Sequence, residues 1–165
     1  MSPRLVLVGP MGAGKTTIAT LLAQRWGVAM RDTDADVEEL EARTISDIFV
    51  ESGEAHFRDL ERKAVAEALA THDGVLALGG GAVLDPTTRE LLAGHTVVFL
   101  RVGLTDAVKR VGLGSARPLL LGNIRSRIKA LLDERTPVYE AVATHVVDTD
   151  GRTPDEVAAQ IEALA

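Results

Sequence analysis

The sequence predicts an α/β domain with a parallel sheet, and three observations lead to this fold class. Short runs of aliphatic residues alternate with longer segments whose apolar residues recur at helical spacing, a pattern typical of buried parallel strands and their covering helices. Aromatic residues make up only 3% of the chain, so Val, Leu, Ile and Ala must build the core. The 165 residues are enough for one domain and too few for two ordinary ones. We therefore expect a single domain over residues 1–165.

Five segments fit the strands of this sheet, each short and rich in aliphatic residues. Five strands are an ordinary number for one sheet. The segments are Arg4–Val8, Ala29–Asp32, Val75–Gly79, Thr96–Val102 and His145–Asp148.

Helices are predicted between these strands by their apolar faces and their end signals. The first ends at Gly27, a residue type suited to the position just past a helix C-terminus. A capping side chain followed by proline begins one helix at Asp85 and the final one at Thr153, where Glu156 completes a capping box. Strand and helix signals therefore alternate as a parallel α/β sheet requires.

Two stretches depart from this alternation. Residues 35–70 are almost entirely helical in pattern, with breaks at Thr44 and at Ser52-Gly53, so we expect a helical insertion between the second and third strands. Residues 112–122 contain three glycines and a proline without a clear period, which suggests a mobile loop between helices.

Charge and composition exclude several classes of protein. The chain has 18 basic and 24 acidic residues, a net charge of -6, which disfavours binding to nucleic acid or to an anionic membrane surface. The absence of cysteine excludes disulfides, thiolate catalysis and cysteine-ligated metal sites. The N-terminus lacks the features of a signal peptide, and no segment approaches the length of a membrane span. We expect a soluble, cytoplasmic protein.

The strongest single motif runs from Gly9 to Thr16, with the sequence GPMGAGKT between the first strand and the first helix, and it fits G-x-x-x-x-G-K-[ST]. Glycines let backbone N–H groups surround a phosphate, and the helix N-terminus directs partial positive charge at it. Lys15 would reach the β- and γ-phosphates, and Thr16 would coordinate Mg²⁺. A plain glycine-rich turn is the alternative, but a chance match is on the order of one in a hundred for a chain of this length. We predict a phosphate-binding loop.

Two acids, Asp32 and Asp34, follow the second strand and lie beside this loop at the carboxyl end of the sheet, where open α/β sheets bind ligands. In an extended stretch residues two apart point the same way, so both carboxylates could face one crevice. One would serve Mg²⁺ through water, and the other would accept a hydrogen bond from a hydroxyl. The alternative is that one or both cap a helix that starts near Asp36. The motif alone favours neither.

Further motifs follow in order, and together they resemble those of the shikimate kinases, small relatives of the nucleoside monophosphate kinases. The resemblance covers essentially the whole chain. It implies a three-layer α/β/α fold with a substrate region at about 33–61 and a lid at about 112–122. It also implies that the chain phosphorylates the 3-hydroxyl of shikimate with ATP and Mg²⁺, in aromatic amino acid biosynthesis. We expect a monomer. The motifs are Ile48-Phe49 with Gly53-Glu54, Phe57-Arg58 with Glu61, Gly79-Gly80-Gly81, Arg117-Pro118-Leu119-Leu120 and Arg135-x-Pro137-x-Tyr139.

The resemblance implies an acceptor site that holds a carboxylate and several hydroxyls. Arg58 and Arg135 match the arginines that bind the carboxylate, for which a planar guanidinium is well suited. Asp34 matches the residue that binds the substrate hydroxyls, with acceptance of the proton as a second role. The other matching residues are Phe49 and Phe57, which would flank the ring, Glu61, and Gly79, Gly80 and Gly81, of which Gly80 would contact substrate through its N–H.

Each of these residues also has an ordinary structural interpretation. Arg58 could pair along its helix with Glu54 or Glu61. Arg135 could be a favourable cation in the last turn of a helix that ends before Pro137. The phenylalanines could be core residues, and three glycines could form a plain turn.

The nucleotide residues implied by the resemblance come from three parts of the chain. Arg117 would close over the phosphates in the manner of an arginine finger. Arg110 and Arg152 with Pro154 would enclose the adenine, although by sequence alone these arginines could equally be solvated. The phosphate loop contributes Gly12, Ala13, Gly14, Lys15, Thr16 and Thr17, and Thr16 with Asp32 forms the expected metal site.

Two other functions remain open from the sequence. A kinase of another small acceptor, such as gluconate or a nucleoside monophosphate, would share the fold. A nucleotide-dependent switch is a second alternative, but the chain lacks an N-K-x-D motif. If the proposed kinase function holds, six basic residues gather in one crevice, which we expect to be positive within an acidic protein.

Overall fold

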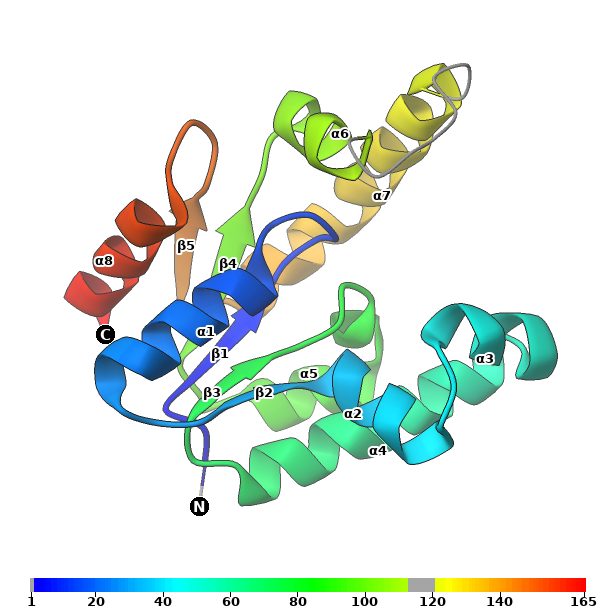
Figure 1. Ribbon diagram of the computed structural model, residues 1–165, viewed down its shortest axis with the longest axis horizontal. Coiled ribbons are helices and arrows are strands. Elements are labelled where there is room, and N and C mark those ends of the chain that lie inside the picture. The colour runs from blue at the N-terminus through cyan, green and yellow to red at the C-terminus, as the bar shows by residue number, and fades with distance from the viewer. Residues whose placement is uncertain (1, 113–120) are drawn as a thin grey trace.

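Five parallel strands form the centre of the molecule, as the sequence predicts (Figure 1). The computed structural model describes residues 2–112 and 121–165. The strand order is β2-β3-β1-β4-β5, and every neighbouring pair is parallel. Each strand lies within a predicted segment: β1 (Leu5–Val8), β2 (Met30–Asp32), β3 (Val75–Ala77), β4 (Val97–Arg101) and β5 (His145–Asp148).

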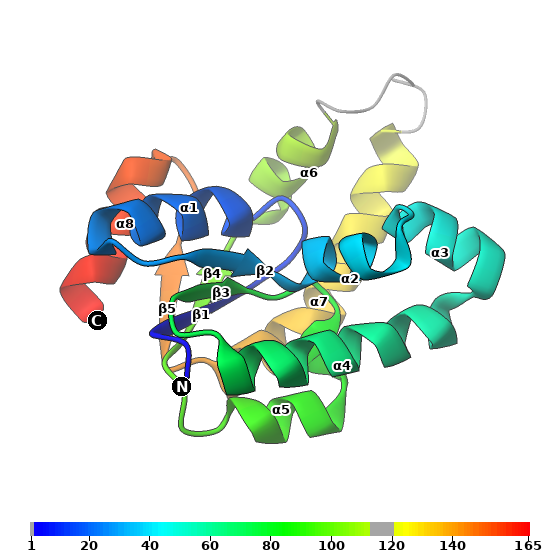
Figure 2. The ribbon, with the colours of Figure 1, turned by 60° about the horizontal axis from the view of Figure 1, so that its bottom comes forward.

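Helices cover both faces of the sheet and give the predicted three layers. Figure 2 shows α1 (Lys15–Trp26) and α8 (Pro154–Leu164) above the strands, with α4 (Glu54–Thr71) and α5 (Pro86–Leu92) below them. The second half of α7 (Leu121–Val142) packs on the same face as α4, and α6 (Leu104–Gly112) contacts α7. In the described part of the chain, no helix is both long enough and apolar enough to cross a membrane.

Strand β1 explains why the strands read as continuous apolar runs. Leu5 and Leu7 belong to the core cluster under α1 and α8, whereas Val6 and Val8 belong to the cluster on the α4 side. All four side chains are buried. A strand covered on both faces has no polar face to alternate with its apolar one.

The predicted helical insertion is confirmed as α2 (Thr33–Glu41), α3 (Ile45–Ser52) and the start of α4. The break at Thr44 is a helix N-cap, where Thr44 Oγ1 accepts a hydrogen bond from the Asp47 N–H at 3.1 Å. The second break is Gly53, whose φ of 86° ends α3. These helices enclose a separate small core of Val37, Ile48 and Phe57.

One detail of the prediction changes at α7. The helix does not end before Pro137 but continues to Val142, so the interpretation of Arg135 as a last-turn cation is wrong. Proline removes one helical hydrogen bond, yet Tyr139 just beyond it is buried in the core below the sheet and keeps the helix in place.

The predicted loop at residues 112–122 is shorter at both ends. Gly112 belongs to α6, Leu121 and Gly122 belong to α7, and residues 113–120 lie outside the described part of the chain.

Candidate active site

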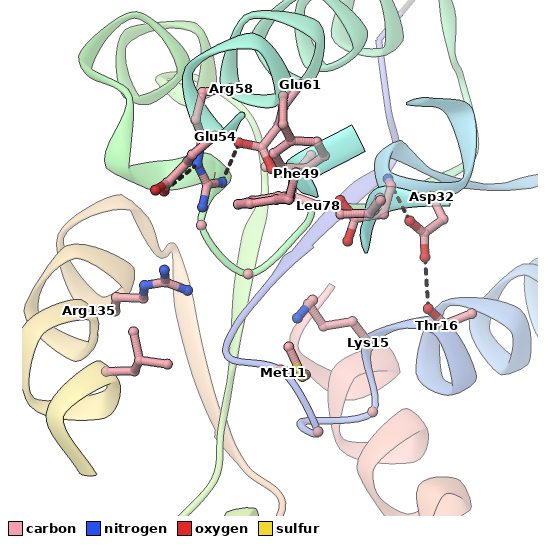
Figure 3. A pocket seen from close by; sticks show the side chains of 18 of the residues that line it. Met11, Lys15, Thr16, Asp32, Phe49, Glu54, Arg58, Glu61, Leu78 and Arg135 are labelled. Carbon is pink, nitrogen blue, oxygen red and sulfur yellow. Dashed lines mark hydrogen bonds and ion pairs between the residues drawn. The ribbon is translucent and has the colours of Figure 1, made fainter. Parts of the chain in front are cut away.

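Two adjoining cavities lie at the carboxyl ends of the strands, on either side of the phosphate loop. The larger has a volume of about 620 Å³ and is enclosed by this loop, the helical insertion, the Gly79–Gly81 loop and α7 (Figure 3). The smaller, of about 230 Å³, lies between the phosphate loop and the start of α8. Gly12, Gly14 and Thr17 line both cavities, so a ligand held by the loop can extend into each.

The phosphate loop has the backbone that its glycines predict. Gly9 has a φ of 152°, and a Cβ there would lie 2.7 Å from the carbonyl oxygen of Leu100, which no other residue tolerates. Gly14 has a left-handed φ of 88° and leads directly into α1. No side chain among the described residues caps α1, so its first N–H groups are available to an anion.

Lys15 folds back over this loop. Its Nζ donates hydrogen bonds to the carbonyl oxygens of Gly9 at 2.6 Å and Pro10 at 3.0 Å. Burial lowers the pKa of Lys15 from 10.5 to about 8, although the carboxylates of Asp34 and Asp32 oppose the shift. Lys15 is therefore mostly charged at pH 7 and lies beside the space that phosphates would fill.

Asp32 performs two functions with its two oxygens. Oδ1 accepts hydrogen bonds from the N–H groups of Asp34 at 2.9 Å and Ala35 at 3.3 Å, so Asp32 caps α2. Oδ2 accepts a hydrogen bond from Thr16 Oγ1 at 2.8 Å, on the side of the phosphate loop. The capping interpretation is therefore correct for Asp32, and its second oxygen still faces the expected metal position.

Asp34 reaches the same cavity by a different geometry from the one predicted. It lies in the first turn of α2, so the side-chain alternation of an extended stretch does not apply. The turn of the helix nevertheless places its carboxylate in the larger cavity. Burial, and to a lesser extent the charges of Asp32 and Glu61, raise the pKa of Asp34 to about 6, although the charge of Lys15 opposes the shift. A carboxylate with this pKa is a competent proton acceptor near neutral pH.

The two arginines of the expected carboxylate site line the larger cavity from different elements, Arg58 from α4 and Arg135 from α7 (Figure 3). Arg58 Nη1 donates to Glu61 Oε1 at 2.8 Å, and Arg58 Nε lies 3.5 Å from Glu54 Oε1. The predicted helical ion pairs are thus both present, and they orient the guanidinium group. Arg135 Nε is buried and has no hydrogen-bond partner in the described part of the protein.

The three glycines after β3 allow close contact with charged side chains. A Cβ at Gly79 would lie 2.4 Å from Asp34 Oδ1, and one at Gly81 would lie 2.6 Å from both terminal nitrogens of Arg58. Gly80 and Gly81 line the larger cavity, whereas Gly79 lies beside Asp34 without lining it. The loop is therefore more than a plain turn, because larger residues would displace Asp34 or Arg58.

The remaining acceptor residues lie where the sequence places them. The rings of Phe49 and Phe57 are 4.9 Å apart between centroids, and both line the larger cavity. Phe57 is buried in the small core of the insertion, so the core interpretation is also correct for it. The Glu61 side chain is only 5% exposed, and burial raises its pKa, which Arg58 opposes.

The expected adenine residues line the smaller cavity. Arg110, Arg152 and Pro154 lie there with Ala13 of the phosphate loop. Arg110 is not simply solvated, since its Nη1 donates to the carbonyl oxygen of Gly12 at 3.0 Å and to Thr149 Oγ1 at 3.2 Å. Arg117 lies outside the described residues.

Sequence reasoning missed several residues that line the larger cavity. Met11 lies inside the phosphate-loop motif, and Glu54 lies one turn before Arg58, so motif position could have indicated both. Leu78 lies in a predicted strand, Ile45 follows the predicted break at Thr44, and Leu131 belongs to none of the motifs. The missed residues are Met11, Ile45, Glu54, Leu78 and Leu131.

Comparison with known proteins decides between the kinases that share this fold. The family model for shikimate kinase matches residues 11–165. The chain belongs to the shikimate kinase family. It is an ATP-dependent kinase of shikimate, and the interpretations as a gluconate kinase, a nucleoside monophosphate kinase or a switch are set aside.

Individual shikimate kinases agree with this assignment over nearly their full length. The chain is 60% identical over 164 residues to a shikimate kinase of Salinispora arenicola, covering 99% of this chain and 98% of the relative. It is also 60% identical to one of Thermobifida fusca, with 94% and 91% covered. A solved shikimate kinase from Acinetobacter baumannii, in complex with shikimate, is 34% identical with a TM-score of 0.90, covering 99% of this chain and 92% of that one.

Proposed function

We propose that this chain transfers the γ-phosphoryl group of ATP to the 3-hydroxyl of shikimate within the larger cavity, giving shikimate 3-phosphate and ADP. The observation that carries the assignment of the site is the convergence of Arg58, Arg135 and Asp34 on the same space as Lys15. Two guanidinium groups can donate charge-assisted hydrogen bonds to a carboxylate of the substrate, and the Asp34 carboxylate can accept one from a hydroxyl. One cavity therefore offers partners for both ends of the acceptor and for a phosphate.

The acceptor residues orient shikimate for an in-line attack. Arg58 and Arg135 hold its carboxylate, Phe49 and Phe57 flank its ring, and Asp34 accepts a hydrogen bond from the 3-hydroxyl. The hydroxyl oxygen forms the bond to the γ-phosphorus while the bond from that phosphorus to the β–γ bridging oxygen breaks, and the proton passes to Asp34. In this step Asp34 positions the hydroxyl first and accepts the proton second.

The donor residues neutralise the phosphates. The N–H groups at the start of α1 bind phosphate oxygens, and Lys15 leaves the carbonyl groups of its own loop to reach the β- and γ-phosphates. Arg117 adds a further positive charge. Arg110, Arg152 and Pro154 enclose the adenine in the smaller cavity, which adjoins the phosphate loop.

Thr16 and Asp32 are the residues that would hold Mg²⁺. Their oxygens lie 2.8 Å apart beside the phosphate loop, and a hydroxyl with a carboxylate is the donor set this ion takes alongside phosphates and water. The described residues contain no group of three or more His, Cys, Asp or Glu that could hold a metal by itself, which agrees with an ion that arrives with the nucleotide. When bound, Mg²⁺ neutralises charge on the β- and γ-phosphates.

We also infer a cytoplasmic monomer whose partners are ATP and shikimate rather than nucleic acid or membrane. The two cavities are built from the elements of a single chain, so the site needs no second copy. The acidic net charge of -6 supports the absence of a polyanion partner.

The Arg58→Ala variant tests the acceptor site. We expect the KM for shikimate to rise at least about thirtyfold, because a charge-assisted pair is worth roughly 2–3 kcal/mol, while the KM for ATP changes less than about threefold. A coupled assay of ADP release measures both. The control is Lys63→Ala on the same helix, a 74% exposed side chain whose one ion pair among the described residues is with Asp59. Equal effects of Arg58→Ala on the two KM values would contradict the assignment of the carboxylate site.

A further inference from the structure

The only tyrosine of the chain, Tyr139, is fully buried beneath the acceptor site and has no part in the mechanism described above. Its hydroxyl donates a hydrogen bond of 2.5 Å to the carbonyl oxygen of Gly80. Its ring packs on Phe99 of β4, with 5.0 Å between the ring centroids. A hydroxyl in the core, below the sheet, is thus directed at the loop that borders the larger cavity.

This hydrogen bond fixes a segment with little stiffness of its own. Three consecutive glycines have the softest backbone available to a protein, so outside contacts must set the orientation of their peptide groups. At one end, the Gly79 N–H donates to Thr33 Oγ1 of α2 at 3.2 Å. At the other, Tyr139 of α7 binds the Gly80 carbonyl group. The loop is therefore held at its first glycine by α2, and the peptide between Gly80 and Gly81 is held by α7 through Tyr139.

That peptide separates the two guanidinium groups of the acceptor site. A Cβ at Gly81 would lie 2.6 Å from the terminal nitrogens of Arg58, and a Cβ at Gly80 would lie 3.7 Å from Arg135 Nη1. Arg135 and Tyr139 are four residues apart on α7 and so lie on one face of the helix. The helix that carries Arg135 is thereby fastened to the loop that contacts Arg58.

We propose that Tyr139 is a positioning residue that sets the spacing and orientation of Arg58 and Arg135 for the carboxylate of the acceptor, acting through the Gly80–Gly81 peptide. The proposal rests on the proposed assignment of these two arginines to that carboxylate. Burial raises the pKa of the Tyr139 hydroxyl, against the effect of the nearby Arg135 charge, so the phenol remains a hydrogen-bond donor across the neutral range.

The Tyr139→Phe variant removes the hydroxyl and keeps the ring. We expect the KM for shikimate to rise about tenfold, because the peptide and the two arginines lose their fixed geometry. We expect kcat and the KM for ATP to change less than twofold, because the phosphate loop and Asp34 do not touch this hydroxyl. Steady-state kinetics with each substrate varied in turn, and calorimetric titration of shikimate and MgADP, measure these values.

The matched control is Phe99→Leu, which removes the ring contact of Tyr139 and keeps the hydroxyl. It should lower the melting temperature and leave the KM for shikimate within twofold of the wild type. An equal rise of this KM in Phe99→Leu would overturn the proposal, since packing rather than the hydroxyl would then set the site. An unchanged KM in Tyr139→Phe, equal rises in both KM values, or a Tyr139→Phe chain that does not fold would overturn it as well.

The Arg58→Ala variant separates this proposal from the assignment of the site itself. If Arg58→Ala raises the KM for shikimate and Tyr139→Phe does not, the role of the hydroxyl fails and the carboxylate site stands. If neither variant changes that KM, the assignment of the carboxylate site fails, and the positioning role fails with it.

Discussion

At the scale of one residue, Lys15 shows that a residue of the site can lower the free energy of unfolding, because its charge is buried. Burial brings its pKa down from 10.5 to about 8, so the folded protein holds a charged ammonium group where water is scarce. Two carbonyl oxygens of its own loop partly replace that water. Burial of this charge therefore destabilises the folded protein, at the residue that we propose binds phosphate.

The pH dependence of stability follows from the direction of this shift. Between about pH 8 and pH 10.5 the unfolded chain binds more protons at Lys15 than the folded chain, so the free energy of unfolding contributed by this residue rises with pH over that window. Below about pH 8 both states are charged, and the cost is constant and at its largest. The Lys15 contribution is thus least favourable at neutral pH.

We predict that Lys15→Met stabilises the nucleotide-free, metal-free protein at pH 7 by about 1–3 kcal/mol and that this gain shrinks toward pH 10. The same substitution should lower kcat at least about a hundredfold. Urea unfolding at the two pH values and an ADP-release assay measure these effects. Lys63→Met, at an exposed position, serves as the control and should leave both unchanged. A Lys15→Met protein less stable than wild type at pH 7 would contradict the cost assigned to Lys15.

At the scale of elements, α2, α3 and the start of α4 form a unit with its own core. Val37, Ile48 and Phe57 pack together away from the two clusters that flank the sheet. This unit carries Asp34, Phe49 and Arg58, whereas the phosphate loop is fixed to the sheet and α1. These three proposed acceptor residues therefore depend on a small core that the phosphate loop does not share.

Ile48→Ala should loosen this unit selectively. Ile48 is fully buried, and such a truncation costs roughly 2–5 kcal/mol, so we expect faster amide hydrogen exchange across residues 33–61 and little change in the strands. The KM for shikimate should rise more than the KM for ATP. Val50→Ala on the same helix is the control, because Val50 is 86% exposed. Uniform acceleration of exchange throughout the sheet would show that the insertion is not a separate unit.

At the scale of the whole molecule, acidic side chains are not confined to the exterior but also line the ligand site. The larger cavity is lined by three basic side chains and by four carboxylates, Asp32, Asp34, Glu54 and Glu61. Arg117, one of the six expected basic residues, lies outside the described residues, so a positive crevice stays a prediction. Asp32 caps a helix, Glu54 and Glu61 orient Arg58, and we propose that Asp34 faces the hydroxyls of shikimate. The smaller cavity is the more positive of the two, because its described lining residues include Arg110 and Arg152 and no carboxylate.

Because shikimate and the nucleotide are proposed to bind different side chains, each ligand should stabilise the protein independently of the other. At a free concentration a hundred times its Kd, shikimate should raise the free energy of unfolding by about 2.7 kcal/mol, and MgADP should do the same. Arg135→Ala should remove the shift caused by the same concentration of shikimate and keep that of MgADP. Lys129→Ala, an exposed position on the same helix, should keep both. Thermal unfolding with each ligand measures the shifts, and loss of both in Arg135→Ala would argue against two separate subsites.

Most of the local structure was predictable because its causes lie within a few residues. The breaks at Thr44 and Gly53, the capping box at Thr153 and the helical pairs of Arg58 all follow from side chains that meet neighbours three or four positions away. The acceptor residues themselves came from the order of motifs along the chain.

By itself, then, the sequence determined the five strands, the phosphate loop, the helical insertion and many of the residues that line the larger cavity, since periodicity, capping and motif spacing depend on residues that are close in the sequence. Tertiary structure alone decided that α7 continues past Pro137, that Asp34 reaches the cavity from a helix, and that Asp32 divides its oxygens between a cap and Thr16. It also joined Tyr139 to Gly80, 59 positions apart. Such contacts depend on how whole elements pack, and no local pattern specifies that packing.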